Sequence, residues 1–335
     1  RHRAGPGPRS LAPAVAAPEA AFLTGRNARG SWKMMQGAVR RHVLPNGIEV
    51  SYQSKAELLQ FYTDIFEKQI YTRGGISLRD GDVVFDVGAN IGLFTTFVAL
   101  SHPGARVFAF EPAPPTFAIL QANAAPYGDR VRLFPCGLSD RAGSAELTFY
   151  LHTSGMSSFY PDEQEETAAL RTLIRNELAS GKPGVEGLLE HEDEWIEQRL
   201  RHETWTCPVK TLSQIVHDEG VTRIDLLKID VEKSELDVLA GIAPGDWRKI
   251  EQVVIEAHDV GDRLQRIEEE LRRHGFAVRW EQDELYRGSD RHNLYAVRDL
   301  LSPAQPVPVE RRPSAVPPQR IVERAQRARD KWKKG

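Results

Sequence analysis

An apolar run that leads into a glycine turn constrains the fold of this chain more than any other feature. Residues 83–85 (Val-Val-Phe) indicate a short buried strand, and residues 86–92 (Asp-Val-Gly-Ala-Asn-Ile-Gly) lead into the apolar, helix-like segment 93–100. A strand, a glycine turn and a helix in this order are typical of the first unit of a doubly wound α/β sheet. Such sheets bind nucleotide-like ligands beside this turn, at the carboxyl ends of their strands.

The glycine spacing favours a ligand that has no phosphate groups. A dinucleotide-binding turn has the pattern G-x-G-x-x-G, in which glycines allow the backbone to approach a pyrophosphate. Here Gly88 and Gly92 flank Asn90, which carries a side chain at the middle position. S-adenosylmethionine tolerates this side chain better than NAD does. An NAD-dependent dehydrogenase stays open as an alternative, but it fits this turn less well.

Polar residues follow the next two strand-like runs. Glu111 comes directly after the apolar residues 107–110 (Val-Phe-Ala-Phe). A carboxylate at the end of the second strand can accept hydrogen bonds from both ribose hydroxyls of a nucleoside. Ser139 and Asp140 come after the third predicted strand, 131–135, and are expected beside the adenine.

Strand-like and helix-like segments alternate over most of the chain, which indicates a parallel sheet with right-handed crossovers. The last two strands are separated by a charged, turn-rich connection and are expected to form an antiparallel pair. Seven strands that end in such a pair are typical of the class I methyltransferase (Rossmann-like) α/β fold, with helices on both faces of the sheet. The predicted strands are 83–87, 106–110, 131–135, 224–230, 253–255, 276–280 and 293–297.

The remaining segments suggest a linker, an N-terminal helical segment, a core with an insertion, and a tail. Residues 1–30 are rich in Pro, Ala and Gly and have the composition of a linker, whereas 31–75 has apolar residues at near-helical spacing. The predicted core, 76–300, is interrupted at about 155–205 by a charged stretch with helix-like pieces. Long insertions of this kind often serve as lids. Residues 301–335 are predicted to be a Pro-rich linker with a basic tail.

Composition and charge exclude several classes of protein. The formal net charge is -3 and the pI is near 6.4, so the chain offers no electrostatic basis for binding nucleic acid. No apolar run approaches the roughly 18 residues that a membrane-spanning helix needs. We therefore expect a protein that binds neither nucleic acid nor membrane. Cys136 and Cys207 have no metal or disulfide spacing, so reduced thiols of a cytoplasmic protein are expected.

Acidic residues and a histidine follow two neighbouring strands of the predicted sheet. Asp230 and Glu232 follow the fourth strand, and Glu256 and His258 follow the fifth. The carboxyl ends of parallel strands lie at one edge of a sheet, so these side chains are expected to converge there. An imidazole can act as a general base while a carboxylate holds its tautomer, so His258 is a candidate base. Asp230, Glu256 and His258 could instead bind a metal ion.

Several motifs together resemble the FkbM family of S-adenosylmethionine-dependent methyltransferases. The resemblance covers about residues 60 to 300. It departs from the family pattern after Glu232, where Lys233 replaces the usual glycine. The motifs are residues 86–92, Phe110-Glu111-Pro112, Leu138-Ser139-Asp140, Ser157-Ser158 and Lys228-Ile229-Asp230-Val231-Glu232.

The family resemblance implies O-methylation with S-adenosylmethionine, and Asp86, Gly88 and Glu111 match the family's cofactor motifs. The linker-like ends and the insertion make the chain similar to domains embedded in modular polyketide synthases. Those domains methylate a β-hydroxyl or enol oxygen of a chain held by an acyl carrier protein, next to neighbouring synthase domains. By this resemblance His258 would be the base and Glu232 its partner, without metal.

Other functions stay open at this point. A free-standing O-methyltransferase of a sugar or natural product would use the same residues on a different acceptor. A C-methyltransferase would use the same base to remove a proton from carbon. A catalytically silent domain that serves as a scaffold would not bind S-adenosylmethionine at all. Asp230 is expected near the methionine moiety if the chain is a methyltransferase.

Overall fold

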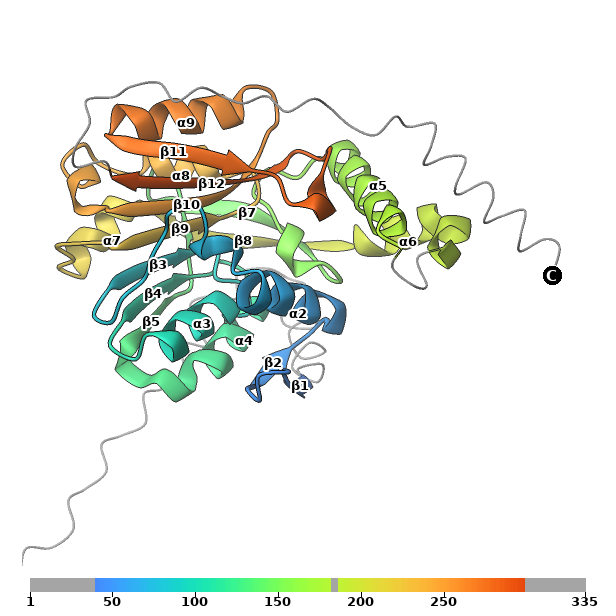
Figure 1. The fold of residues 1–335 in the computed structure, drawn as a ribbon, viewed down its shortest axis with the longest axis horizontal. Helices are drawn as coiled ribbons and strands as arrows, with labels where there is room; N and C mark the ends of the chain where they lie inside the picture. The colour runs from blue at the N-terminus through green and yellow to red at the C-terminus, as the bar shows by residue number, and fades with distance from the viewer. Residues whose placement is uncertain (1–39, 182–185, 299–335) are drawn as a thin grey trace, which may run out of the picture.

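The computed structural model describes residues 40–181 and 186–298 and has a seven-stranded sheet at its centre (Figure 1). The strand order is β11-β12-β10-β9-β3-β4-β5. Strand β12 is antiparallel to both of its neighbours, and the strands from β10 to β5 are parallel to one another. This arrangement confirms the predicted class I methyltransferase sheet. The strands are Val83–Val87 (β3), Arg106–Phe110 (β4), Val131–Phe134 (β5), Leu226–Asp230 (β9), Gln252–His258 (β10), Phe276–Glu281 (β11) and Arg291–Arg298 (β12).

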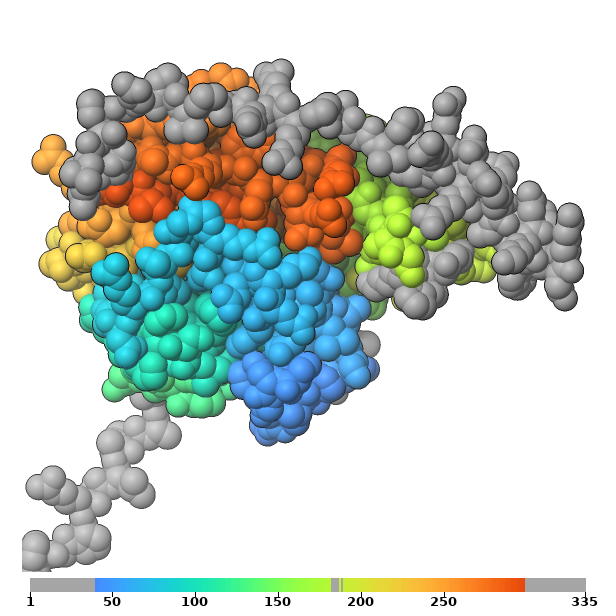
Figure 2. Space-filling view, viewed as in Figure 1, coloured from blue at the N-terminus to red at the C-terminus, as the bar shows by residue number. Residues whose placement is uncertain are grey.

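Helices cover both faces of this sheet, because alternate residues of each strand point to opposite sides. In β3, Phe85 belongs to one hydrophobic layer and Val84 to the other. In Figure 2 the N-terminal segment, coloured blue, lies against the teal and green helices of the second layer. The first layer contains α7 (Leu212–Asp218), α8 (Glu235–Ala240) and α9 (Arg263–Arg273), and the second contains α2 (Lys55–Tyr62), α3 (Leu93–Ser101) and α4 (Pro114–Ala124).

The N-terminal segment differs from the predicted helix over its first part. Its described part, from residue 40, starts with a β-hairpin of β1 (Arg40–Val43) and β2 (Glu49–Tyr52), and helix follows from α2 onward. The turn contains Asn46 and Gly47, and Gly47 has a φ of 83°. Asn-Gly between alternating apolar residues is a strong hairpin signal, and the helical interpretation overlooked it. A π-helical turn, Thr63–Glu67, and a 3₁₀ turn, Ile70–Thr72, follow α2.

The insertion is larger than the predicted 155–205, and part of it is a sheet. Strands β7 (Gly143–Tyr150) and β8 (His202–Lys210) pair antiparallel, and β6 (Gly137–Leu138) joins β8. The helices α5 (Glu163–Ala179) and α6 (Glu192–Arg199) lie between these strands in the sequence, with a 3₁₀ turn, Glu186–His191, before α6. The helices have their own small apolar cluster, formed around Leu170, Ile174 and Ile196.

Some predictions concern parts of the chain that the structure does not describe. The predicted linker 1–30 and the tail 301–335 lie outside the described residues. Within residues 40–181 and 186–298, no helix has both the length and the apolar character needed to cross a membrane.

Candidate active site

A cavity of about 500 Å³ lies at the carboxyl ends of β3, β4, β9 and β10. This is the edge of the sheet at which the sequence predicted a ligand. One part of the cavity is lined by the glycine turn, another by the acids after β9 and β10, and a third by the insertion and α2. Its lining includes Gly88, Ala89, Asn90, Ile91, Glu111, Gly137, Leu138, Lys228, Asp230, Glu232, Glu256 and Arg291, together with Phe61, Met156, Leu170, Leu173, Ile174 and Trp195.

The glycine turn is shaped by close backbone contacts. Gly88 has a φ of 77°, and a β-carbon on it would lie 1.7 Å from the carbonyl oxygen of Asp230. Asn90 also has a positive φ, 48°, and its side-chain oxygen accepts a hydrogen bond from the backbone N–H of Ile91 at 2.8 Å. Gly92 begins α3 with a φ of 84° and lies outside the cavity lining. The turn therefore presents backbone and the Asn90 side chain to a ligand.

Glu111 borders the cavity where the sequence placed the ribose-binding carboxylate. Its two oxygens accept hydrogen bonds from the backbone N–H groups of Asn90, at 3.0 Å, and Ala113, at 2.9 Å. Burial raises the pKa of this carboxyl to about 7, although the two N–H groups counteract the shift. Each carboxylate oxygen keeps a second lone pair, which can accept from a ligand hydroxyl.

Lys228, which the sequence motifs contained but did not single out, lines the cavity and links the glycine turn to two acids. Its Nζ lies 3.1 Å from Asp86 and 3.4 Å from Asp230, and donates to the carbonyl of Gly88 at 2.7 Å. Burial would lower the pKa of Lys228, but the two carboxylates raise it above its usual value. Asp86 is fully buried outside the cavity lining, so it supports the turn from below. The sequence did contain a signal for this residue, because a lysine inside an otherwise apolar strand must find buried partners for its charge.

Two predicted cofactor residues lie away from the cavity lining. Ser139 and Asp140 are absent from it, and Asp140 is an exposed residue that pairs with Arg141. The preceding residues Gly137 and Leu138 line the cavity instead. Their position beside the adenine therefore stays a prediction, and Leu138, just before them, is paired with Lys210 of β8.

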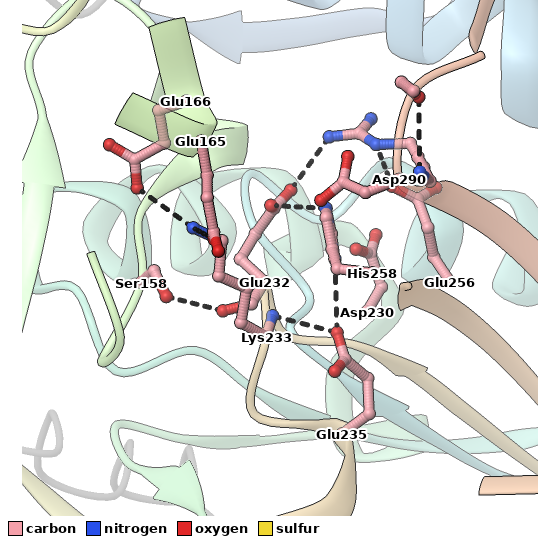
Figure 3. A network of polar contacts seen from close by, with 12 residues as sticks. Ser158, Glu165, Glu166, Asp230, Glu232, Lys233, Glu235, Glu256, His258 and Asp290 are labelled. Atoms are coloured by element: carbon pink, nitrogen blue, oxygen red, sulfur yellow. Dashed lines mark hydrogen bonds and ion pairs between the residues drawn. The ribbon is translucent and has the colours of Figure 1, made fainter. Parts of the chain in front are cut away.

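The acids after β9 and β10 converge with the histidine as predicted (Figure 3). Glu232 lies next to His258, whose Nε2 is 3.0 Å from the Glu232 carboxylate. The other ring nitrogen, Nδ1, is 3.3 Å from Glu235, which the sequence analysis missed. Burial lowers the pKa of His258, but Glu232 and Glu235 offset this effect and hold it well above the usual value. Each ring nitrogen of His258 therefore faces a carboxylate, an arrangement that favours the protonated ring.

His258 lies behind Glu232 when viewed from the large cavity. Glu232 lines this cavity and a smaller adjacent one of about 60 Å³, whereas His258 lines only the smaller one. The sequence placed the histidine at the reacting centre, with the carboxylate behind it. In the structure Glu232 faces the large cavity and His258 lies behind it. Strand β10 ends at His258, and the turn after β9 places the Glu232 side chain between His258 and that cavity.

Arg291, which the sequence analysis did not identify, joins two of the converging acids. Its guanidinium lies 3.1 Å from Glu232 and 3.0 Å from Glu256. Burial raises the pKa of Glu256 to about 8, and Arg291 counteracts this shift. Carboxylate oxygens of Asp230, Glu232 and Glu256 come within 4.8 Å of one another, a spacing that could hold a metal ion. Arg291 already supplies positive charge to two of the three.

The turn after β9 has an unusual backbone. Glu232 and Lys233 have φ values of 47° and 76°, and neither is a glycine. The left-handed conformation costs roughly 1–2 kcal/mol for each residue that carries a β-carbon. Strain of this size persists only where surrounding contacts hold it, and such sites are often functional.

Comparison with known proteins identifies the family. The Methyltransferase FkbM domain family matches residues 86–278. The 31-O-demethyl-FK506 methyltransferase FkbM of Streptomyces tacrolimicus is 43% identical over 269 residues, which are 79% of this chain and 99% of that protein. This chain belongs to the FkbM methyltransferase family. The family and the class I fold imply S-adenosylmethionine as the methyl donor.

Other FkbM-type relatives differ in overall length. AMB antimetabolite synthetase AmbE of Pseudomonas aeruginosa is 41% identical over 262 residues, which are 76% of this chain but 12% of that protein. Methyltransferase sdnD of Sordaria araneosa is 32% identical over 67% of this chain and 84% of its own length. The crystal structure of methyltransferase FkbM from Methylobacillus flagellatus KT has a TM-score of 0.43 and 16% identity, covering 81% of this chain and 59% of that chain.

The residues that line the large cavity have the chemical groups needed to bind S-adenosylmethionine. Glu111 offers carboxylate oxygens for ribose hydroxyls, and the turn at Gly88 brings backbone to the cavity wall. Asp230 could bind the amino end of the methionine moiety, and the Tyr71 hydroxyl, which donates to it at 2.8 Å, orients its carboxylate. Burial and Asp230 keep the pKa of Tyr71 well above its usual value, so this hydroxyl stays protonated.

Proposed function

We propose that this chain is an O-methyltransferase that acts on a β-hydroxyl or enol of an acyl chain held by an acyl carrier protein. The observation that carries this proposal is the carboxylate of Glu232, which borders the cavity next to the glycine turn and is backed by His258 at 3.0 Å. A group that accepts a proton is thus close to the proposed donor site. We further propose that neighbouring synthase domains surround the chain, in the cytoplasm.

We assign proton acceptance to the Glu232–His258 pair, with Glu232 in contact with the acceptor hydroxyl. The bound sulfonium supplies an electrophilic methyl group. As the acceptor oxygen bonds to the methyl carbon and the methyl–sulfur bond breaks to leave the neutral thioether, the hydroxyl proton would pass to a Glu232 oxygen. Each Glu232 oxygen has a free lone pair beside its contact with His258 or Arg291. His258 keeps this carboxylate in place. A positioned base contributes about 10²–10⁴-fold to the rate.

The lining of the insertion side supports an acyl acceptor. Leu170, Leu173 and Ile174 of α5 face the cavity, as do Trp195 of α6 and Met156. An apolar wall of this kind favours an alkyl chain, because burying apolar surface contributes about 25 cal/mol per Å². The same side also carries polar residues, among them Ser154, Glu177 and Arg199, which could bind the hydroxyl group of the acceptor.

Two relatives support the oxygen acceptor and the carrier-bound form. The name of the Streptomyces relative, 31-O-demethyl-FK506 methyltransferase, describes methylation at oxygen. The match to 12% of AmbE shows that a domain of this type occurs within a much longer protein, which is named a synthetase. The first of these relatives also supports the alternative acceptor, a hydroxyl of a free natural product.

The deciding experiment is intact-protein mass spectrometry of a carrier protein loaded with a β-hydroxyacyl chain. The loaded carrier is incubated with S-adenosylmethionine and the purified chain, with and without EDTA. We expect a gain of one methyl mass in both conditions, and fragmentation should locate it on oxygen. A methyl on carbon would favour the C-methyltransferase instead. No gain despite measurable donor binding would favour a free sugar or natural-product acceptor.

Variants of the proposed pair test the mechanism. Glu232→Gln and His258→Ala should each lower turnover by about 10²-fold or more, with donor affinity nearly unchanged, because neither side chain is assigned to the donor. Glu235→Gln should have a smaller effect, since Glu235 does not line the large cavity and contacts only His258 and the backbone N–H of Lys233 among the groups at this site. Full turnover in Glu232→Gln would overturn the assignment. Loss of turnover in EDTA, restored by Mg²⁺, would assign Asp230, Glu232 and Glu256 to a metal site.

A further inference from the structure

We propose that Lys233 is a positioning residue that ties the turn bearing Glu232 to helix α5 of the insertion and holds that turn in its active shape. The inference rests on the proposed role of Glu232 in proton transfer. Lys233 makes no contact with the proposed acceptor site and lines only the smaller cavity. Its effect on the reaction would therefore pass through the backbone of Glu232.

The side chain of Lys233 points away from the base and toward the insertion (Figure 3). Its Nζ lies 3.0 Å from Glu165 and 3.6 Å from Glu166, both in the first turn of α5. The lysine is 8% exposed and Glu166 is 4% exposed, so the contact with Glu166 is shielded from solvent, whereas the side chain of the nearer partner, Glu165, is 37% exposed. Shielded pairs are screened less by salt than surface pairs, and losing one partner leaves an uncompensated buried charge.

Further contacts join the same turn to the insertion. The hydroxyl of Ser158 donates to the carbonyl of Glu232 at 2.5 Å. Glu166, besides its contact with Lys233, accepts a hydrogen bond from the hydroxyl of Tyr150 in β7. The turn after β9 is thus held from the insertion by both its backbone and a side chain.

The other side of Lys233 leads to the proposed base. Its backbone N–H donates to Glu235 at 2.9 Å, and the same Glu235 oxygen lies 3.3 Å from Nδ1 of His258. A rotation of the Lys233 backbone would therefore move Glu232 and disturb Glu235 at the same time. Both of the carboxylates that hold His258 depend on this one residue.

The backbone conformation explains why such a tether is needed here. Glu232 and Lys233 are consecutive left-handed residues, and each carries a β-carbon that disfavours this conformation. Glycine would adopt a φ of 76° without this penalty. The ion pair with α5 offsets the strain at Lys233, so the position of α5 and the position of Glu232 are coupled.

The test compares Lys233→Met, which keeps the strain and removes the charge, with Lys233→Gly, which removes both. A carrier-bound 3-hydroxyhexanoyl chain serves as the probe for turnover. We expect Lys233→Met to lower kcat about tenfold or more with KM for S-adenosylmethionine unchanged, because a small displacement of the base is costly. Lys233→Gly should stay within about threefold of wild type, since the relaxed turn needs no tether. Lys233→Arg should restore most of the activity.

A second readout does not depend on activity. Amide hydrogen exchange within residues 163–179 should be about tenfold faster in both Lys233→Met and Lys233→Gly, because both lose the anchor of α5. Glu165→Gln should slow turnover in the wild-type background and have no effect in Lys233→Gly. Arg171→Met is the matched control, because Arg171 joins α5 to Asp193 at 2.8 Å without touching the turn.

The outcomes separate this proposal from the proposed function. If the wild-type chain methylates no carrier-bound probe, the proposed function fails, and the exchange measurement alone decides whether Lys233 anchors α5. If Lys233→Met exchanges and turns over like wild type, the tether does not exist. Equal loss of turnover in Lys233→Met and Lys233→Gly would also overturn the proposal, because the charge and not the shape of the turn would then matter.

Discussion

Gly88 lies where the turn after β3 meets the end of β9, and the backbone there leaves no room for a side chain. A β-carbon would be 1.7 Å from the carbonyl oxygen of Asp230, far inside van der Waals contact. Lys228 donates to the carbonyl of Gly88 itself and pairs with Asp86 and Asp230. These residues therefore form one unit, in which the turn, the buried lysine and the acid after β9 constrain each other.

We expect Gly88→Ala to destabilise the fold by more than about 2 kcal/mol, because a β-carbon would push β9 away from β3. Chemical denaturation measures the change, and calorimetric titration with S-adenosylmethionine should show lost binding. Gly81→Ala is the matched control, since Gly81 has a φ of 90° with nothing near its β-carbon position. Equal effects of the two substitutions would mean that backbone strain, and not the contact with Asp230, matters at Gly88.

Glu111 allows a prediction about the pH dependence of donor binding. Its pKa of about 7 in the free protein means that the carboxylate, which is proposed to accept from ribose hydroxyls, is a minor form at pH 6. Affinity for S-adenosylmethionine should therefore rise about tenfold between pH 6 and pH 8, as the competent fraction grows. Glu111→Gln should bind more weakly and lose this dependence in calorimetric titration. An unchanged pH profile in the variant would contradict the assignment.

At the scale of elements, the insertion is a unit with its own small core. The apolar residues of α5 and α6 pack on each other, while β7 and β8 connect the two helices to the sheet. Part of this apolar surface also lines the cavity. The insertion can therefore shape the acceptor site without contributing strands to the central sheet.

Ile196→Ala should loosen the insertion while leaving the sheet intact. Ile196 is buried in α6, in the cluster with Leu170 and Ile174, and does not line the cavity. Truncating a buried isoleucine to alanine removes all side-chain carbons beyond Cβ and lowers the free energy of unfolding by about 2–5 kcal/mol when the cavity left behind stays open. Hydrogen exchange should speed up across α5 and α6 but not in β3 or β9. Faster exchange throughout the chain would show that the insertion does not open independently.

At the scale of the whole molecule, several buried acids have the same effect on stability. Burial raises the pKa of Glu57 and Glu111 to about 7 and that of Glu256 to about 8, from an ordinary value of 4.5. At a pH between 4.5 and the raised pKa values, the folded chain binds more protons than the unfolded chain. The free energy of unfolding therefore falls as pH rises through this range. His258 acts in the same direction, because its raised pKa stabilises the fold below about pH 6.5 and this contribution is lost at higher pH.

Glu57→Gln should therefore make stability less dependent on pH. Glu57 accepts from the backbone N–H of Gly155 at 3.0 Å, and a glutamine can keep this contact through its carbonyl oxygen. Urea unfolding from pH 5 to pH 8 should show the free energy of wild type falling more steeply than that of the variant. The gap should be of the order of 1–3 kcal/mol, at about 1.4 kcal/mol per pKa unit. Parallel curves would show that Glu57 does not titrate in this range.

Local patterns in the sequence determined the sheet and the donor site. Apolar runs, glycine turns and their alternation with helices depend on neighbouring residues, so β3, β4 and the final antiparallel pair were predicted within a residue or two. The turn 86–92 and Glu111 were found because each lies directly after a strand. The Asn46-Gly47 hairpin was also present as a local signal and was overlooked.

Tertiary structure alone decided how the proposed catalytic groups meet. Arg291 reaches Glu232 and Glu256 because β12 pairs antiparallel with β10, in a register that sets Arg291 opposite His258. The order of Glu232 and His258 and the anchoring of Lys233 depend on a strained turn and on contacts with α5. These contacts join residues far apart in the chain. Spacing along a sequence determines which face or edge a residue occupies, but strand register and packing determine which partner it finds there.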